Sequence, residues 1–158
     1  MGKISQTFNW MKIVVDSNIA FSAVLNLNSK IGQILIKSGK LFSFYSVPQL
    51  REEVIEYKEK IQTLGKYTDD EFTEITKLVF HKIEFIDDLL IPKPELLKAE
   101  KLVEGVDIDD VLFIALTNHL RARLWTGDKT LIRGMQKREW HRFISVEELY
   151  LKMIERGK

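Results

Sequence analysis

Our predictions of fold and function start from two neighbouring segments of the sequence. They are Asp107-Ile-Asp-Asp-Val-Leu-Phe-Ile-Ala-Leu-Thr-Asn118 and Leu124-Trp-Thr-Gly-Asp-Lys129. Three aspartates (Asp107, Asp109 and Asp110) precede an apolar helix, and a short apolar strand leads to a fourth, Asp128. An aspartate before a helix caps free backbone N–H groups and suits the positive end of the helix dipole. Three aspartates in four positions exceed what capping needs, because their charges repel unless cations gather there. The segment therefore suggests a metal site, with capping as the alternative role of Asp107 and Asp109.

Length and composition indicate one folded domain. The 158 residues suffice to bury a proper core, and 45% hydrophobic residues with a formal net charge of +1 argue against disorder. The absence of cysteine excludes disulfides and thiolate metal ligands and favours a cytoplasmic setting. No apolar run approaches the roughly 20 residues that span a bilayer, so we expect no membrane partner. We expect residues 1–10 to be an N-terminal extension and residues 11–158 to form a single domain.

Apolar patterns and cap residues predict strands that alternate with helices along the chain. Strands are predicted at residues 12–16, 41–46, 82–86, 123–126 and 142–145. Helices are predicted at residues 19–25, 31–39, 48–65, 68–79, 94–105, 110–120, 129–133 and 146–154. This order predicts an α/β fold, a three-layer α/β/α sandwich with a mostly parallel central sheet of about five strands. Ligands of such sheets bind beyond the carboxyl ends of the strands, where Asp16 and Asp128 are expected.

Four short motifs follow one another along the chain. They are Val14-Val-Asp-Ser-Asn18, Ser46-Val-Pro-Gln-Leu-Arg-Glu-Glu-Val54, Asp107-Ile-Asp-Asp110 and Leu124-Trp-Thr-Gly-Asp-Lys-Thr-Leu131. In this order they resemble the motifs of PIN-domain proteins, the metal-dependent nuclease fold that includes the VapC-type toxins of toxin–antitoxin pairs. The resemblance implies that the catalytic and metal-binding acids are Asp16, Glu53, Asp110 and Asp128. It adds Asp107 as a further metal ligand, from a branch that has proline where this chain has Ile108.

The acids and the residues around them predict the cofactor and the side chains that would support the site. Carboxylates without histidine or cysteine favour a hard divalent cation, so we expect Mg²⁺ or Mn²⁺ as the cofactor. Supporting hydrogen bonds to the acids are expected from Ser17, Asn18 and Thr126. Candidates for binding the RNA backbone come from a basic stretch, which could equally be a solvated face; they are Arg121, Arg123, Lys129 and Arg133. Phe113 and Trp125 are predicted to belong to the core and not to a base-stacking platform.

The resemblance implies a metal-dependent endoribonuclease that hydrolyses single-stranded or looped RNA as the toxin of a toxin–antitoxin pair. It also implies an antitoxin protein and a second copy of the chain, in a homodimer, as partners. One alternative is a PIN-fold module that binds RNA or protein and cuts nothing. Another is a phospho-accepting receiver-like domain, also α/β with carboxylates around Mg²⁺, although Lys129 lies in the wrong motif for it.

Overall fold

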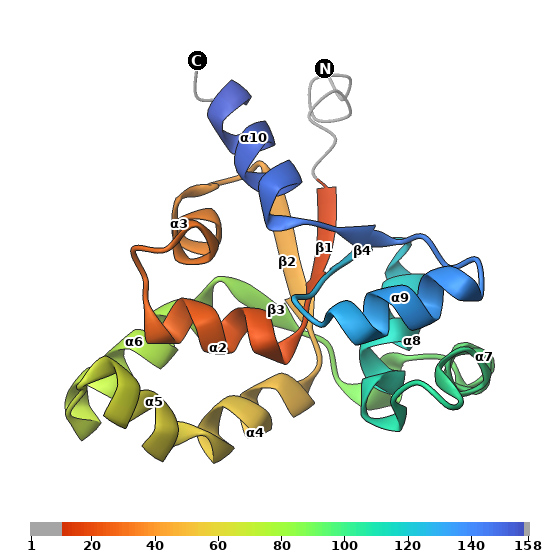
Figure 1. Ribbon diagram of the computed structural model, residues 1–158, viewed down its shortest axis with the longest axis horizontal. Coiled ribbons are helices and arrows are strands. Elements are labelled where there is room, and N and C mark those ends of the chain that lie inside the picture. The colour runs from red at the N-terminus through yellow and green to blue at the C-terminus, as the bar shows by residue number, and fades with distance from the viewer. Residues whose placement is uncertain (1–10, 157–158) are drawn as a thin grey trace.

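Five strands form a single parallel sheet in the computed structural model, which describes residues 11–156 (Figure 1). The extension expected at residues 1–10 lies outside the described residues. In the sheet the strand order is β3-β2-β1-β4-β5, and all four pairings are parallel. The strands are β1 (Met11–Val15), β2 (Phe42–Ser46), β3 (Ile83–Phe85), β4 (Arg123–Trp125) and β5 (Phe143–Ile144).

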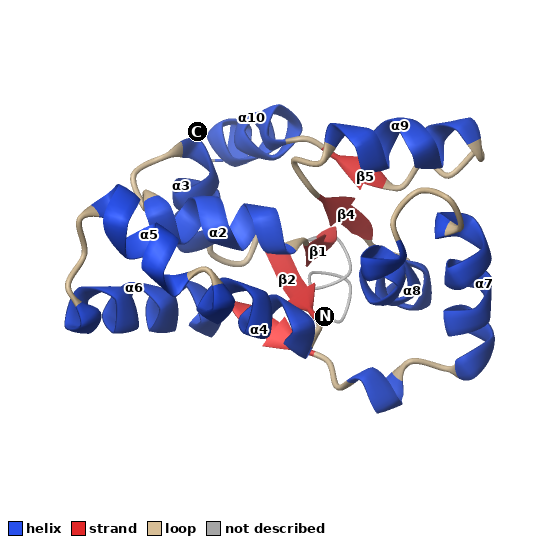
Figure 2. Ribbon diagram, turned by 60° about the horizontal axis from the view of Figure 1, so that its bottom comes forward, coloured by secondary structure: helices blue, strands red, loops and turns tan. Residues whose placement is uncertain are grey.

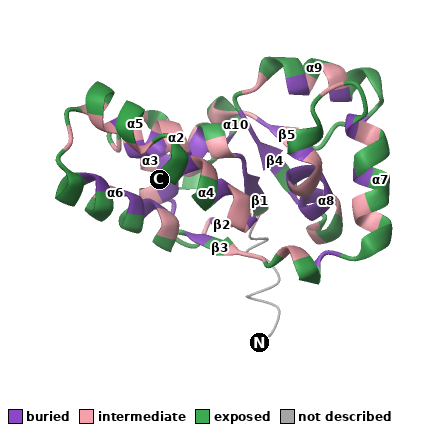
Figure 3. Ribbon diagram, turned by 90° about the horizontal axis from the view of Figure 1, so that it is seen from below, coloured by how far each residue is buried: buried purple, intermediate pink, exposed green. Residues whose placement is uncertain are grey.

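Helices cover both faces of this sheet (Figure 2). Figure 3 shows α2 to α6 on one side of the strands and α7 to α9 on the other, which confirms the predicted three-layer α/β/α sandwich. The α-helices are α2 (Ser17–Leu25), α3 (Lys30–Lys37), α4 (Pro48–Glu56), α5 (Lys58–Gly65), α6 (Asp69–His81), α7 (Lys93–Val103), α8 (Val111–Leu120), α9 (Lys129–Lys137) and α10 (Val146–Arg156). Two short 3₁₀ turns complete the chain, η1 (Asp88–Leu90) and η2 (Ile108–Asp110).

The core follows the apolar segments of the sequence. Ile13, Val14 and Val15 of β1 are fully buried, as expected for a central strand with helices on both faces. Helix α8 is apolar around most of its circumference because it lies between the sheet and α7. Phe113 and Trp125 are each 1% exposed, which confirms that they belong to the core.

Most element boundaries lie within two residues of the prediction, and three features differ by more. The helix expected at residues 48–65 is two helices, α4 and α5, which are separated at Tyr57. Neither proline nor glycine occurs at this break, so the sequence gives no signal for it. The helix expected to end at Arg133 continues to Lys137, and η1 lies between the strand predicted at residues 82–86 and the helix predicted at residues 94–105.

The strand order creates a crevice at the carboxyl end of β1. After β1 the chain passes through α2 and α3 to β2 on one side, whereas β4, on the other side of β1, leads into α9. Ligands of parallel sheets bind at such a switch point. Within residues 11–156 no single helix is long and apolar enough to cross a membrane; α2 and α3 pass that test only as a pair, bent by 98°.

Candidate metal centre

Asp16 lies at the bottom of this crevice, at the end of β1 and at the N-cap of α2. Its backbone N–H donates to the carbonyl of Trp125 at 3.0 Å, which continues the β1–β4 pairing by one residue. Its Oδ1 accepts a hydrogen bond from the backbone N–H of Ser17 at 2.8 Å, and its Oδ2 accepts one from Thr126 Oγ1 at 2.7 Å. Asp16 is 4% exposed. Its carboxylate is held by hydrogen bonds from the start of α2 and from the loop after β4.

Asn18 ties the start of α2 to the loop that follows β4. Its Nδ2 donates to Asp16 Oδ2 at 3.2 Å and to Thr126 Oγ1 at 3.1 Å. Its Oδ1 accepts a hydrogen bond from the backbone N–H of Gly127 at 2.8 Å. The structure thus brings Asn18 and Thr126, two of the three predicted supporting residues, into one network around Asp16.

Asp107, Asp110 and Asp128 face one another across the crevice. Each offers a carboxylate oxygen, and these three oxygens all lie within 4.8 Å of one another. Asp128 caps α9 through the N–H of Leu131 at 3.0 Å, and Asp107 caps η2 through the N–H of Asp109 at 3.0 Å. Each of these two caps uses only one carboxylate oxygen. Capping and metal binding are therefore compatible at Asp107 and Asp128.

Glu53 comes from α4, on the wall of the crevice formed by the helix. Its Oε1 accepts a hydrogen bond from Ser17 Oγ, and its Oε2 lies 3.4 Å from Gln49 Nε2. The same Gln49 amide donates to the backbone carbonyl of Asp109 at 2.9 Å. Gln49 therefore connects α4 to η2, a role that the sequence analysis missed. Its position one helical turn before Glu53 is the signal that could have suggested it.

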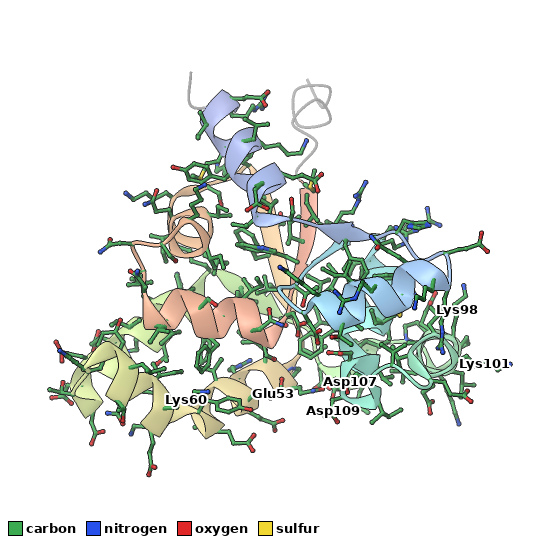
Figure 4. All side chains as sticks on the ribbon, viewed as in Figure 1. Glu53, Lys60, Lys98, Lys101, Asp107 and Asp109 are labelled. Atoms are coloured by element: carbon green, nitrogen blue, oxygen red, sulfur yellow. The ribbon has the colours of Figure 1, made fainter. Side chains whose placement is uncertain are left out.

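These residues line a cavity of about 450 Å³. Figure 4 shows Glu53 between Lys60 on one side and Asp107 and Asp109 on the other. Six carboxylates line the cavity, those of Asp16, Glu53, Asp107, Asp109, Asp110 and Asp128. All four acids assigned from the resemblance thus lie around one space, together with Asp107.

Burial and mutual repulsion raise the pKa values of two of these acids, Asp110 and Asp16. Burial first, and then the charges of the neighbouring acids, together raise the pKa of Asp110 to about 8; these acids are Asp16, Asp107, Asp128 and Glu53. Burial also raises the pKa of Asp16 to about 6, although its hydrogen bonds from Thr126 and Ser17 act in the opposite direction. A nearby cation would favour the ionised forms of both groups.

Helix capping does not explain the position of the Asp110 side chain, whereas metal binding does. Its side chain makes no capping hydrogen bond to α8, and its buried Oδ2 has no hydrogen-bond partner. A buried carboxylate oxygen without a partner is costly unless a cation or water satisfies it. The donor set consists of carboxylate oxygens, which suits Mg²⁺ or Mn²⁺ and would suit a softer metal poorly. The residues therefore fit a hard divalent cation.

The structure does not bring the four basic candidates together at the acids. Arg121 follows the last residue of α8, about 15 Å along that helix from Asp110. Arg123 begins β4, at the opposite end of the strand from Asp128, and donates to the carbonyl of Phe143 at 3.2 Å. Lys129 and Arg133 are on α9, which begins at the acidic edge, but Lys129 lines a second cavity. Among the described residues that line the acidic cavity, the only cation is Lys60, which we did not predict.

Comparison with known proteins agrees with this architecture. The family model described as "PIN domain" matches residues 14–147, and the chain belongs to this family. The crystal structure of PAE2754 from Pyrobaculum aerophilum has a TM-score of 0.65 at 16% identity and covers 92% of this chain and 96% of that chain. This likeness shows the fold. No curated protein matches the sequence. PIN domains are generally nucleases that use divalent metals, so the fold of this chain is of a nuclease type.

Proposed function

We propose that the protein is a metal-dependent endoribonuclease that hydrolyses phosphodiester bonds in single-stranded or looped RNA. The observation that carries this proposal is the buried Asp110 carboxylate, which has an unpartnered oxygen and lies beside Asp107 and Asp128. Carboxylates this close favour a bound cation, and membership of the PIN-domain family connects such cations to nuclease chemistry. Unpaired RNA suits the crevice better than a duplex because its flexible backbone can enter a narrow space.

Each residue of the centre has a role in this mechanism. Mg²⁺ or Mn²⁺, when bound, stabilises charge on the phosphate and makes a water more acidic. Asp107, Asp110 and Asp128 would hold the metal, because their oxygens already converge. Asp16 would act with them from the bottom of the crevice in its ionised form, which predominates at pH 7 because its pKa is about 6.

The remaining contacts orient these acids. Asn18 and Thr126 hold the Asp16 carboxylate in one orientation, since both donate to its Oδ2. Ser17 and Gln49 hold Glu53 at the rim of the crevice. Supporting hydrogen bonds of this kind tune the affinity for a metal, typically by about 10- to 100-fold per residue.

We further propose, on the resemblance alone, that the nuclease is the cytoplasmic toxin of a toxin–antitoxin pair and forms a homodimer. Induced expression would then arrest growth only when Asp16 is intact, and co-expression of the antitoxin would restore growth. Sedimentation equilibrium would give the mass of a dimer. Growth arrest by an Asp16→Asn variant as strong as that by the wild type would contradict the toxin role.

The test of the enzymatic proposal is cleavage of a mixed single-stranded RNA pool in Mn²⁺, in Mg²⁺ and in EDTA. Asp16→Asn and Asp128→Asn, purified identically, are expected to lose the cleavage that the wild type shows with either metal. Glu52→Gln is the matched control, because Glu52 is exposed, adjoins Glu53 and does not line the cavity. Cleavage that survives in Asp16→Asn or in EDTA would contradict the proposal. RNA binding without metal binding or cleavage would favour the non-catalytic binding module instead.

A further inference from the structure

The acidic cavity is asymmetric, because its far end is lined by aromatic rings and a lysine in place of carboxylates. Phe21 of α2, with Tyr57 and Lys60 at the break between α4 and α5, lines this end. In Figure 4, Lys60 lies on the side of Glu53 away from Asp107 and Asp109. The cavity therefore offers acids for a metal and, next to them, groups of a different chemistry.

The three side chains form a compact unit. The rings of Phe21 and Tyr57 meet edge to face, with centroids 5.7 Å apart and an angle of 88° between their planes. Lys60 Nζ lies 6.0 Å from the centroid of the Phe21 ring. Tyr57 is 50% exposed, so much of its ring remains open to a ligand after this packing.

The helical spacing aligns this unit with the acids. Glu53, Tyr57 and Lys60 are four and seven residues apart, and the N–H of Tyr57 still bonds the carbonyl of Glu53 at 3.2 Å across the break. Glu53 and Tyr57 therefore lie one helical turn apart on the same side of α4, whereas Lys60 belongs to the first turn of α5, beyond the break. A chain that runs along the cavity from the acids would thus meet Tyr57 and then Lys60.

Lys60 is also available to bind an anion. In the part of the chain that the structure describes, the one salt bridge joins Lys58 to Asp69, and none involves Lys60. A phosphate held at the acids can be neutralised by metal ions, whereas the next phosphate along the strand needs a cation from the protein. A base attached to that strand can stack on an exposed aromatic ring whatever its sequence.

We propose that Phe21, Tyr57 and Lys60 form a nucleotide-binding subsite for single-stranded RNA beside the metal centre. Tyr57 stacks on a base next to the scissile phosphate, Lys60 pairs with the flanking phosphate, and Phe21 supports both side chains. The proposal rests on the proposed nuclease function, since it names how the substrate of the same cavity is held. The subsite selects flexible single strands over duplexes, because only an unpaired base can offer its face to Tyr57.

The test measures the affinity of the full chain for a short fluorescein-labelled single-stranded RNA by anisotropy. Ca²⁺ occupies the oxygen ligands in this assay, and a gel confirms that the RNA stays intact. Tyr57→Ala is expected to weaken binding by about tenfold, whereas Tyr57→Phe keeps the ring and stays within about twofold of the wild type. Lys60→Gln is expected to weaken binding and to reduce the slope of log affinity against log salt by about 0.7.

Lys30 and Tyr150 provide a matched control, because Lys30 Nζ lies 5.2 Å from the centroid of the Tyr150 ring and neither residue lines the cavity. Lys30→Gln and Tyr150→Phe are expected to bind RNA as the wild type does. Wild-type affinity in both Tyr57→Ala and Lys60→Gln, with their thermal unfolding unchanged, would overturn the subsite and leave the nuclease proposal standing. A wild-type protein that binds no RNA with any divalent cation would overturn both.

Discussion

Replacing Asp110 by asparagine should stabilise the metal-free protein at neutral pH, although it removes a ligand of the proposed metal. The carboxylate is 8% exposed, its Oδ2 has no partner, and burial with four neighbouring carboxylates raises its pKa from 3.8 to about 8. The unfolded chain ionises the same group near 3.8. At pH 7 the folded protein therefore keeps a proton that the unfolded chain has released.

This difference in protonation between the folded and unfolded chains sets the size of the stability change. One pKa unit corresponds to about 1.36 kcal/mol, and roughly three units separate 3.8 from pH 7, so the cost is at most about 4 kcal/mol. Water in the cavity and small side-chain shifts reduce this electrostatic cost, so we take about 2 kcal/mol as its lower limit. Asparagine is neutral in both states and avoids the cost. Asp110→Asn should therefore raise the free energy of unfolding by about 2–4 kcal/mol at pH 7 in EDTA.

The stability difference between Asp110→Asn and the wild type should change sign when metal is bound and should disappear in acid. Because the folded pKa lies above the unfolded one, the folded wild type binds more protons between about pH 4 and pH 8, and its stability falls as the pH rises through this window. Near pH 4 the wild type and Asp110→Asn should be almost equally stable. In Mn²⁺ at pH 7 the wild type should gain stability through binding, whereas the variant should gain little.

The assay is urea unfolding followed by circular dichroism at about pH 4 and pH 7, in EDTA and in Mn²⁺. Asp109→Asn is the control, because Asp109 is an exposed carboxyl beside Asp110, and we expect its effect in EDTA to stay within about 0.5 kcal/mol. Destabilisation of the metal-free protein by Asp110→Asn at both pH values would show that burying the Asp110 carboxyl is not costly. It would mean that the Asp110 carboxylate makes a stabilising contact in the absence of any cation.

Two further substitutions test the supporting contacts, and a third, Gly32→Ala, tests packing outside the cavity. Asn18→Ala removes the hydrogen bonds to Asp16, Thr126 and Gly127; it should cost about 1–3 kcal/mol in urea unfolding and lower Mn²⁺ affinity by about 10- to 100-fold in calorimetry. Gln49→Ala should lower Mn²⁺ affinity by about tenfold and change stability by less than about 1 kcal/mol. Unchanged Mn²⁺ affinity would show that Gln49 does not position the acids. Gly32→Ala, distant from the cavity, should cost about 1–3 kcal/mol at unchanged Mn²⁺ affinity, because its Cβ would overlap the Leu27 backbone.

The sequence predicted the sheet because buried strands are local patterns, and it pointed to the acids through four short motifs that resemble those of PIN-domain proteins. Buried strands such as β1 appear as β-branched runs, and Asp16 follows such a run directly. The alternation of strands with helices then implies parallel pairing, which brings the ends of β1 and β4 to one edge. Asp16 and Asp128 could therefore be placed near each other although they are more than 100 residues apart.

What the sequence did not reveal depends on contacts between distant segments. The break at Tyr57 has no local signal, and it is accompanied by packing of the ring against Phe21 of another helix. The amide of Gln49 reaches the carbonyl of Asp109, 60 residues later in the chain. The four basic candidates remain a prediction, because their closeness in sequence to the acids does not extend to all of them in space. Arg121 and Arg123 are close to Asp128 in sequence, but α8 and β4 separate them from the acidic edge in space.

Metal-dependent cleavage is tested most directly by a Mn²⁺ titration in which metal binding and RNA cleavage are measured on the same preparation. We expect cleavage to rise with occupancy of the metal centre, to be abolished by EDTA and to return when Mn²⁺ is added again. In Asp110→Asn both the binding and the cleavage curves should move together to higher metal concentrations. Cleavage at Mn²⁺ concentrations where the centre is empty, or full occupancy without cleavage of any single-stranded RNA, would contradict a metal-dependent nuclease.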